Sequence, residues 1–113
     1  MISVIIPNFN YAHYLKQRIQ SVLNQTYTDI EVILLDDCST DNSLEVMREF
    51  SDSRIVGVFP NEVNTGSPFR QWQKGIEMAK GEYIWIRMCW CASLWISYLR
   101  TGRFRLLKAI RIL

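Results

Sequence analysis

Two adjacent aspartates, Asp36 and Asp37, stand between an apolar run at residues 32–35 and a polar cluster at residues 39–42. A continuous apolar run bounded by turn residues is typical of a strand that is buried on both faces of a parallel sheet. Open α/β sheets bind ligands at the carboxyl ends of their strands. Because unpaired buried charge is costly and neighbouring strand residues face opposite ways, we expect one acid to face a crevice and the other to brace the backbone. The alternative is that both acids only cap the following helix.

The elements that must position these acids alternate between strand and helix patterns. Pro7 is expected to end the first strand, because proline cannot donate to a sheet ladder. Apolar runs predict four strands, at residues 2–6, 30–35, 55–59 and 83–86. Apolar residues at helical spacing predict three helices, at residues 11–24, 42–50 and 67–80. The alternation predicts an α/β fold in which right-handed crossovers join parallel strands.

Two of the expected helices begin with recognisable cap signals. Asn42, followed three residues later by Glu45, resembles a capping box. Ser67 before Pro68 is typical of an N-cap followed by proline at the first helical position. These signals predict where the polypeptide leaves the carboxyl edge of the sheet.

The loops at that edge carry residues that suit a nucleotide diphosphate. Phe9 offers a flat face to a base, Asp37 offers an acceptor to a base N–H, and Arg70 offers a cation to phosphate. The helix that begins near Ser67 adds backbone donors and the positive end of its dipole. Two of these residues also have a plainer interpretation, Phe9 as a core residue and Arg70 as part of a solvated helix face.

Charge divides the chain near residue 86. Residues 1–86 contain seven Lys or Arg and eleven Asp or Glu, whereas residues 87–113 contain six Lys or Arg and no acid. This basic segment has no recognisable nucleic-acid-binding motif, so we expect no nucleic-acid partner. Three cysteines, an odd number, argue against a disulfide scaffold and for a reducing compartment. With no visible targeting segment and no apolar run of about 18 residues, we expect a cytoplasmic location, or one at the inner face of the membrane.

Two long stretches of the chain resemble a known family. They read ISVIIPNFNYAHYLKQRIQSVLNQTYTDIEVILLDDCSTDNS and NEVNTGSPFRQWQKGIEMAKGEYIWI, and both resemble the nucleotide-sugar-binding half of the A-type, inverting family 2 glycosyltransferases. The resemblance covers residues 1–86 without a gap. It implies a Rossmann-like open parallel sheet with strand order 3-2-1-4, as part of a truncated A-type glycosyltransferase fold. The implied activity is transfer of a glycosyl group to an acceptor hydroxyl, in cell-wall or polysaccharide biosynthesis.

The resemblance also implies roles for individual residues. Asp37 would bind the uracil N3–H or its equivalent, Phe9 would stack on the base, and Pro7 would line the same pocket. The segment from Gly66 to Arg70 would lie beside the diphosphate of a UDP- or dTDP-sugar. The expected nucleotide-sugar-binding residues are Pro7, Phe9, Asn10, Asp36, Asp37, Gly66 and Arg70.

The chain departs from the family after residue 86. There the family has a short acidic motif that holds a divalent metal, Mn or Mg, against the donor phosphates, and its catalytic base lies further along. Here residues 87–91 read RMCWC, without a carboxylate. We therefore expect residues 87–113 to be a divergent basic tail produced by a shifted reading frame or a damaged gene, and the chain to be inactive alone. Without further strands, the fourth strand would be an open edge that favours aggregation.

Four alternatives remain open from the sequence. The tail could be a genuine amphipathic helix, residues 94–113, lying on an anionic membrane surface. The chain could be a non-catalytic nucleotide-binding module. It could be a phosphoryl receiver module, although such modules need Asp and Lys at the ends of later strands, where this chain has Phe59 and Ile86. Cys89 and Cys91 could bind a soft metal, but two ligands are too few for zinc.

Overall fold

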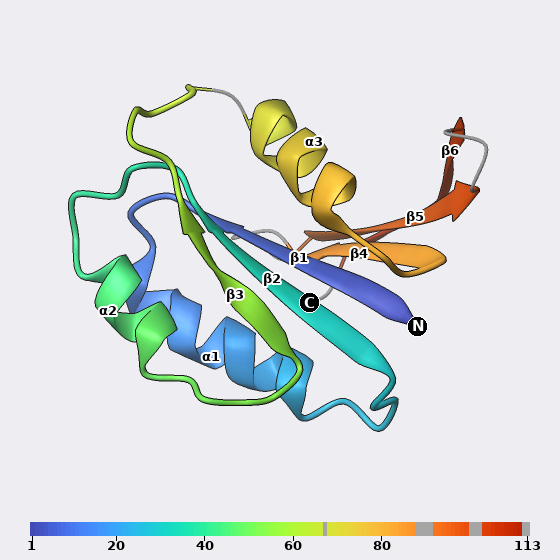
Figure 1. The fold of residues 1–113 in the computed structure, drawn as a ribbon, viewed down its shortest axis with the longest axis horizontal. Coiled ribbons are helices and arrows are strands. Elements are labelled where there is room, and N and C mark those ends of the chain that lie inside the picture. The colour runs from blue at the N-terminus through green and yellow to red at the C-terminus, as the bar shows by residue number, and fades with distance from the viewer. Residues whose placement is uncertain (67, 88–91, 100–102, 112–113) are drawn as a thin grey trace.

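The fold is an α/β sandwich around one twisted sheet (Figure 1). This computed structural model describes residues 1–66, 68–87, 92–99 and 103–111. The strands are β1 (Ile2–Asn8), β2 (Ile30–Asp36), β3 (Ile55–Pro60), β4 (Tyr83–Arg87), β5 (Ala92–Leu99) and β6 (Arg103–Arg111). The helices are α1 (Ala12–Leu23), α2 (Ser43–Arg48) and α3 (Pro68–Met78).

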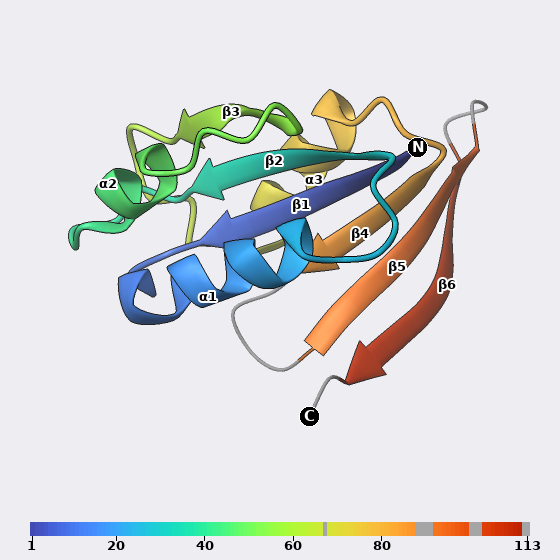
Figure 2. The same cartoon turned by 90° about the horizontal axis from the view of Figure 1, so that it is seen from below.

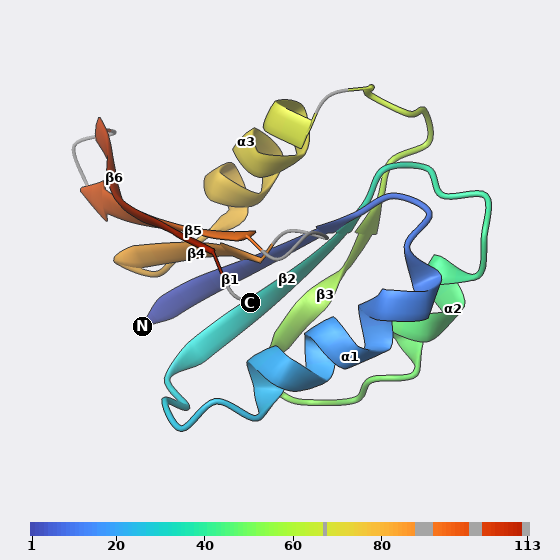
Figure 3. The same ribbon diagram turned by 180° about the vertical axis from the view of Figure 1, so that it is seen from behind.

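The four strands predicted from the sequence form a parallel sheet in the predicted order. β1 lies at its centre and pairs in parallel with β2 on one side and β4 on the other, while β3 pairs in parallel with β2. α1 and α2 cover one face of this sheet and α3 covers the other (Figures 1 and 3). The expected Rossmann-like order 3-2-1-4 is therefore confirmed.

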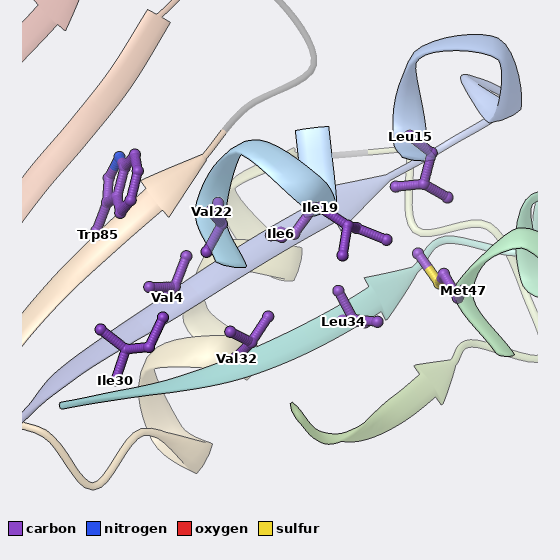
Figure 4. Close-up of a cluster of buried hydrophobic side chains, with 10 residues drawn as sticks. All are labelled: Val4, Ile6, Leu15, Ile19, Val22, Ile30, Val32, Leu34, Met47 and Trp85. Carbon is purple, nitrogen blue, oxygen red and sulfur yellow. The ribbon is translucent and has the colours of Figure 1, made fainter. Parts of the chain in front are cut away.

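The core has two layers because side chains along a strand alternate between faces. In β2, Val32 and Leu34 pack under α1 and α2, whereas Ile33 and Leu35 pack under α3. All seven residues of β2 are buried, as a continuous apolar run predicts for a strand covered on both faces. Figure 4 shows the cluster beneath α1 and α2, which consists of Val4, Ile6, Leu15, Ile19, Val22, Ile30, Val32, Leu34, Met47 and Trp85.

β1 continues through Pro7 to Asn8, so the prediction that proline ends this strand is wrong. The Asn8 carbonyl accepts a hydrogen bond from the Asp37 N–H at 2.9 Å, so the backbone polar groups of Asn8 face β2. The backbone polar groups of Pro7 face β4 instead, because successive residues of a strand point their N–H and C=O groups to opposite sides. On that side the pairing of β1 with β4 ends at Ile5, and the missing N–H of Pro7 interrupts no ladder bond.

The start of α2 differs from the predicted capping box. Asn42 occupies the N-cap position but its side chain makes no cap hydrogen bond. Asp41 takes this role instead, because its Oδ1 accepts a hydrogen bond from the Ser43 N–H at 3.0 Å and another from the Ser43 hydroxyl. α3 begins at Pro68 as predicted, and Ser67 lies outside the described residues.

The tail extends the sheet instead of forming a helix. β5 pairs antiparallel with β4, and β6 pairs antiparallel with β5, which gives the order β3-β2-β1-β4-β5-β6 (Figure 2). The alternative of an amphipathic helix at residues 94–113 is therefore wrong over β5 and β6. The hypothesis of membrane-surface binding depended on that helix and has no further support. The broad, unstriped apolar pattern of this segment suits strands better than a helix.

The expectation of an open edge at β4 is also wrong, because β5 covers it and the outer edge moves to β6. Within the described ranges, no helix is long and apolar enough to cross a bilayer.

A buried polar clamp fixes the amino edge of the sheet. Glu31 Oε1 accepts hydrogen bonds from the Ser3 hydroxyl at 2.6 Å and the Lys80 N–H at 2.7 Å. The Gly81 N–H donates to Ser3 Oγ at 2.8 Å. A Cβ at Gly81 would lie 2.7 Å from the Met1 carbonyl oxygen, so this close approach requires glycine. The clamp sets where β4 enters the sheet.

We expect Glu31→Ala to lower the free energy of unfolding by about 2 kcal/mol, because it leaves the buried Ser3 hydroxyl and Lys80 N–H without their acceptor. Urea unfolding midpoints would measure the change. Glu31→Gln keeps an oxygen at this position and should cost clearly less. Equal losses in the two variants would contradict the role given to the acceptor.

Candidate functional site

Asp36 braces the turn that follows β2. Its Oδ1 accepts hydrogen bonds from the Ser39 hydroxyl at 2.6 Å and from Asn8 Nδ2 at 3.1 Å, and its Oδ2 accepts one from the Ser39 N–H at 2.9 Å. The side chain is fully buried. Three donors compensate the burial of this carboxylate, so Asp36 is the backbone-bracing member of the acidic pair.

Asp37 faces the other side and is held by the loop between β3 and α3. Its Oδ1 accepts hydrogen bonds from the Thr65 N–H at 2.9 Å and from Asn61 Nδ2 at 3.0 Å. Its Oδ2 accepts one from the Thr65 hydroxyl at 2.9 Å. An ionised carboxylate has about four acceptor positions, so Oδ2 retains capacity for a donor from a ligand.

Asn61 links Asp37 to α3. Besides donating to Asp37, Asn61 Nδ2 donates to Gln71 Oε1 at 3.2 Å. Lys74 Nζ donates to Asn61 Oδ1 at 2.7 Å. These contacts involve residues that were not predicted from the sequence, namely Asn61, Thr65, Gln71 and Lys74. One signal was present, since polar Gln71 and Lys74 are one helical turn apart, between the apolar residues of the inward face of α3.

Asn10 belongs to the scaffold that joins the loop after β1 to the turn after β2. Its Oδ1 accepts a hydrogen bond from the Thr40 N–H at 2.8 Å, and its own N–H donates to Ser39 Oγ at 3.0 Å. Asn10 has φ 54°, a left-handed conformation that asparagine tolerates better than most residues. Asp41 Oδ2 accepts a further bond between the same loops, from the Ala12 N–H at 3.1 Å.

The remaining predicted residues lie along the same carboxyl edge. Phe9 is 41% exposed in the loop after β1, so its interpretation as a core residue is wrong. Pro7 is half-buried near the end of β1. Gly66 is exposed, with φ 67° that favours glycine, and Arg70 is exposed in the first turn of α3. The fold thus gathers the loops carrying these residues at one end of the sheet (Figure 1).

The residues at the carboxyl end of β4 do not fit a divalent metal. β4 ends at the cation Arg87, and no Asp, Glu or His follows Glu82 in the sequence. Mn²⁺ and Mg²⁺ are bound chiefly by carboxylate and other oxygen ligands. Over the part of the chain that the structure describes, no group of three or more His, Cys, Asp or Glu could hold a metal. Cys89 and Cys91 lie outside the described residues.

The hydrogen bonds of Asp41 should make part of the stability of the fold sensitive to acid. Burial alone would raise its pKa, but hydrogen bonds from the Ser43 side chain and the Ala12 N–H outweigh it and hold the pKa below its ordinary value. A lowered folded-state pKa gives stability that is complete above the unfolded-state pKa and disappears as the pH falls through the folded-state pKa.

We therefore expect the stability difference between the wild type and Asp41→Ala to be constant above about pH 5 and to shrink below about pH 4. Urea unfolding of both chains at pH 6 and pH 3 would measure it. A difference of the same size at both pH values would show that the ionised carboxylate contributes nothing.

The sequence of residues 3–86 matches the family model of glycosyl transferase family 2. The chain belongs to this family. The match ends one residue before Arg87, where the acidic segment ceases and the basic tail begins. Family membership also separates the chain from the phosphoryl receiver modules considered above.

Curated relatives match the same segment. The chain is 42% identical over 88 residues to glycosyltransferase GlyG of Streptococcus pneumoniae, which covers 76% of this chain and 29% of that protein. It is 31% identical over 84 residues to the poly(ribitol-phosphate) beta-N-acetylglucosaminyltransferase TarS of Staphylococcus aureus, covering 73% of this chain and 15% of TarS. The chain thus spans less than a third of the length of either protein.

Solved structures share the fold. The structure of S. aureus TarS 1-349 in complex with UDP-GlcNAc matches with a TM-score of 0.72 and 29% identity, over 77% of this chain and 26% of that one. A mannosyltransferase from Pyrobaculum calidifontis, in complex with GDP-Man and Mn²⁺, matches with a TM-score of 0.69 and 21% identity, over the same shares. The second likeness concerns the fold alone.

Proposed function

We propose that residues 1–86 bind the nucleotide of a sugar donor, with uracil or thymine as its base, for transfer of the glycosyl group to an acceptor hydroxyl. One observation carries this proposal. Asp37 lies at the carboxyl edge of the sheet with its carboxylate fixed by Asn61 and Thr65 and with acceptor capacity left on Oδ2. The TarS structure with UDP-GlcNAc, 29% identical over the shared region, supports this donor class.

In this proposal the base lies between an acceptor and an aromatic face. Asp37 accepts the N3–H of the pyrimidine, while Phe9 stacks on the ring and Pro7 lines the pocket. Asn10 and Asp36 hold the two loops in place through Ser39. The Gly66–Arg70 segment lies beside the diphosphate, to which Arg70 supplies a cation.

The acceptor in this proposal is a hydroxyl of a cell-wall or cell-surface polymer. The relative TarS, whose name specifies poly(ribitol-phosphate) as its acceptor, supports that class. In this scheme the chain acts in the cytoplasm, a reducing compartment that suits an odd number of cysteines.

We further propose that residues 87–113 are not the family's sequence and derive from a shifted reading frame or a damaged gene, so that this chain alone does not transfer sugar. Two observations support this proposal. The family match ends at residue 86, and no acidic residue follows Glu82. The DNA around codon 86 would test this, since an acidic motif should appear in another frame. Sugar transfer by the purified 113-residue chain would contradict it.

A nucleotide-binding module without chemistry is the second candidate, and Arg87 at the end of β4 favours it for this chain. The two candidates share the nucleotide site and differ only in transfer. A transfer assay on the chain with its reading frame restored at codon 86 separates them.

Phe9→Ala tests the base site directly. In saturation-transfer difference NMR with UDP, we expect the uracil H5 and H6 signals to be the strongest for the wild type and to fall several-fold in this variant, because the stacking face is lost. Tyr14→Ala is a matched control, since Tyr14 is an aromatic residue of α1 that is 60% exposed. Equal signals in both variants would contradict the stacking role of Phe9.

A further inference from the structure

The Gln71 side chain carries a buried donor that the fold does not use. Gln71 is 3% exposed, and its Oε1 accepts a hydrogen bond from Asn61 Nδ2 at 3.2 Å. Its Nε2 is buried and has no hydrogen-bond partner among the described residues. A buried donor left unpaired costs about 1–3 kcal/mol, so the position of this amide calls for an acceptor.

The orientation of this amide follows from its neighbours. Lys74 has only donors, so the oxygen of Asn61 must face Lys74 Nζ, which lies at 2.7 Å. The Asn61 nitrogen then faces Asp37 Oδ1 at 3.0 Å and Gln71. Gln71 must present its oxygen to that nitrogen, because the flipped amide would set two donors against each other. Nε2 is therefore the atom left without an acceptor at the end of the chain of contacts that begins at Asp37.

This chain of contacts joins the Asp37 carboxylate to the Gln71 amide. Asp37 Oδ1 and Gln71 Oε1 both lie within hydrogen-bond distance of one Asn61 nitrogen. Uracil and thymine present an N–H flanked by carbonyl oxygens, which complements an acceptor beside a donor. Cytosine presents a ring nitrogen acceptor to Asp37 in place of the N–H, and its 4-position carries an amino donor in place of a carbonyl, so it would fit these groups less well.

We propose that Gln71 is a second base-reading residue, whose Nε2 donates to the carbonyl oxygen beside the N–H that Asp37 accepts. The proposal rests on the proposed function, since it needs a pyrimidine nucleotide at Asp37. Gln71, on α3, would then determine base specificity together with Phe9 and Asp37, which lie in the loops after β1 and β2. The proposal predicts that UDP binds at least about tenfold more tightly than CDP.

A thio-substitution cycle tests the contact. 2-Thio-UDP and 4-thio-UDP keep the N3–H but replace one carbonyl oxygen by sulfur, a weaker acceptor. For the wild type, we expect one of the two analogues to bind about 3- to 10-fold more weakly than UDP. In Gln71→Met, which removes the donor, that penalty should disappear. A change confined to folding would weaken the binding of UDP and of both analogues alike, whereas a lost contact between Gln71 and the base removes the penalty of one analogue only.

Two further variants sharpen the test. Gln71→Glu keeps an oxygen for Asn61 but has no amide donor, so it should also lose the discrimination while Asp37 stays in place. Gln73→Met is the matched control, since Gln73 is an exposed glutamine of α3 whose Nε2 lies 3.4 Å from Glu77 Oε1, and it should keep the wild-type penalty.

A thio penalty that is the same in the wild type and Gln71→Met would overturn the assignment of Gln71 and leave the proposed function standing. No binding of UDP by the wild type would overturn both, so the two failures are distinguishable.

Discussion

Replacing Asp37 by alanine is expected to weaken UDP binding roughly 10- to 150-fold, because a hydrogen bond to a charged acceptor contributes about 1.5–3 kcal/mol. The substitution removes the acceptor for the base N–H and also releases Asn61 and Thr65, which hold that carboxylate. Titration of UDP into the wild-type and variant chains, followed by NMR or calorimetry, would measure the dissociation constants.

Asp37→Asn separates the two consequences of this change. The amide keeps an oxygen for the Asn61 and Thr65 donors, so the loop should stay in place. Its nitrogen replaces an acceptor with a donor, so UDP binding should still fall at least about tenfold. An affinity of Asp37→Asn or Asp37→Ala for UDP equal to that of the wild type would contradict the assignment of Asp37 to the base.

Replacing Asp36 by alanine is expected to act on folding instead, and to lower the free energy of unfolding by about 3 kcal/mol. Asp36 is fully buried and its carboxylate receives the Ser39 N–H, the Ser39 hydroxyl and Asn8 Nδ2. Its loss removes the acceptor shared by the buried Asn8 amide and the half-buried Ser39, and it releases the turn that carries Asp37. Urea unfolding of the two variants side by side would measure the difference.

Ser39→Ala is the graded control for Asp36. It removes one of the three donors to the carboxylate and leaves the backbone N–H in place, so it should cost about 1 kcal/mol. A stability loss for Asp36→Ala no larger than that for Ser39→Ala would show that the Asp36 carboxylate does not brace this turn.

The parallel half of the fold was predictable because its signals are local. The apolar run of β2 and the helical stripe of α1 each match the observed element to within a residue or two. The end of β1 was not predictable, since Pro7 is tolerated only because β4 stops pairing at Ile5. That depends on the register of a strand about 80 residues away. The strands of the tail were missed because this segment was assigned to a shifted reading frame, with a helix as the alternative, and strands were not considered.

The different roles of the two acids were predictable from strand alternation, which places Asp36 and Asp37 on opposite faces of the sheet. The residues that hold Asp37 could not be derived in the same way. Asn61 and Thr65 come from a loop with no periodic pattern, and Gln71 reaches the site only through α3 packing on the sheet. Such contacts are tertiary, so sequence spacing alone does not contain them.

The central claim is that a nucleotide diphosphate binds at the carboxyl edge of the parallel strands. An amide ¹H–¹⁵N NMR titration of the 113-residue chain with UDP tests it most directly. We expect the largest shifts at Phe9, Asp37 and Thr65, in the loops after β1, β2 and β3. Shifts confined to the amino edge around Glu31 and Gly81, or no shifts at millimolar UDP, would contradict the claim.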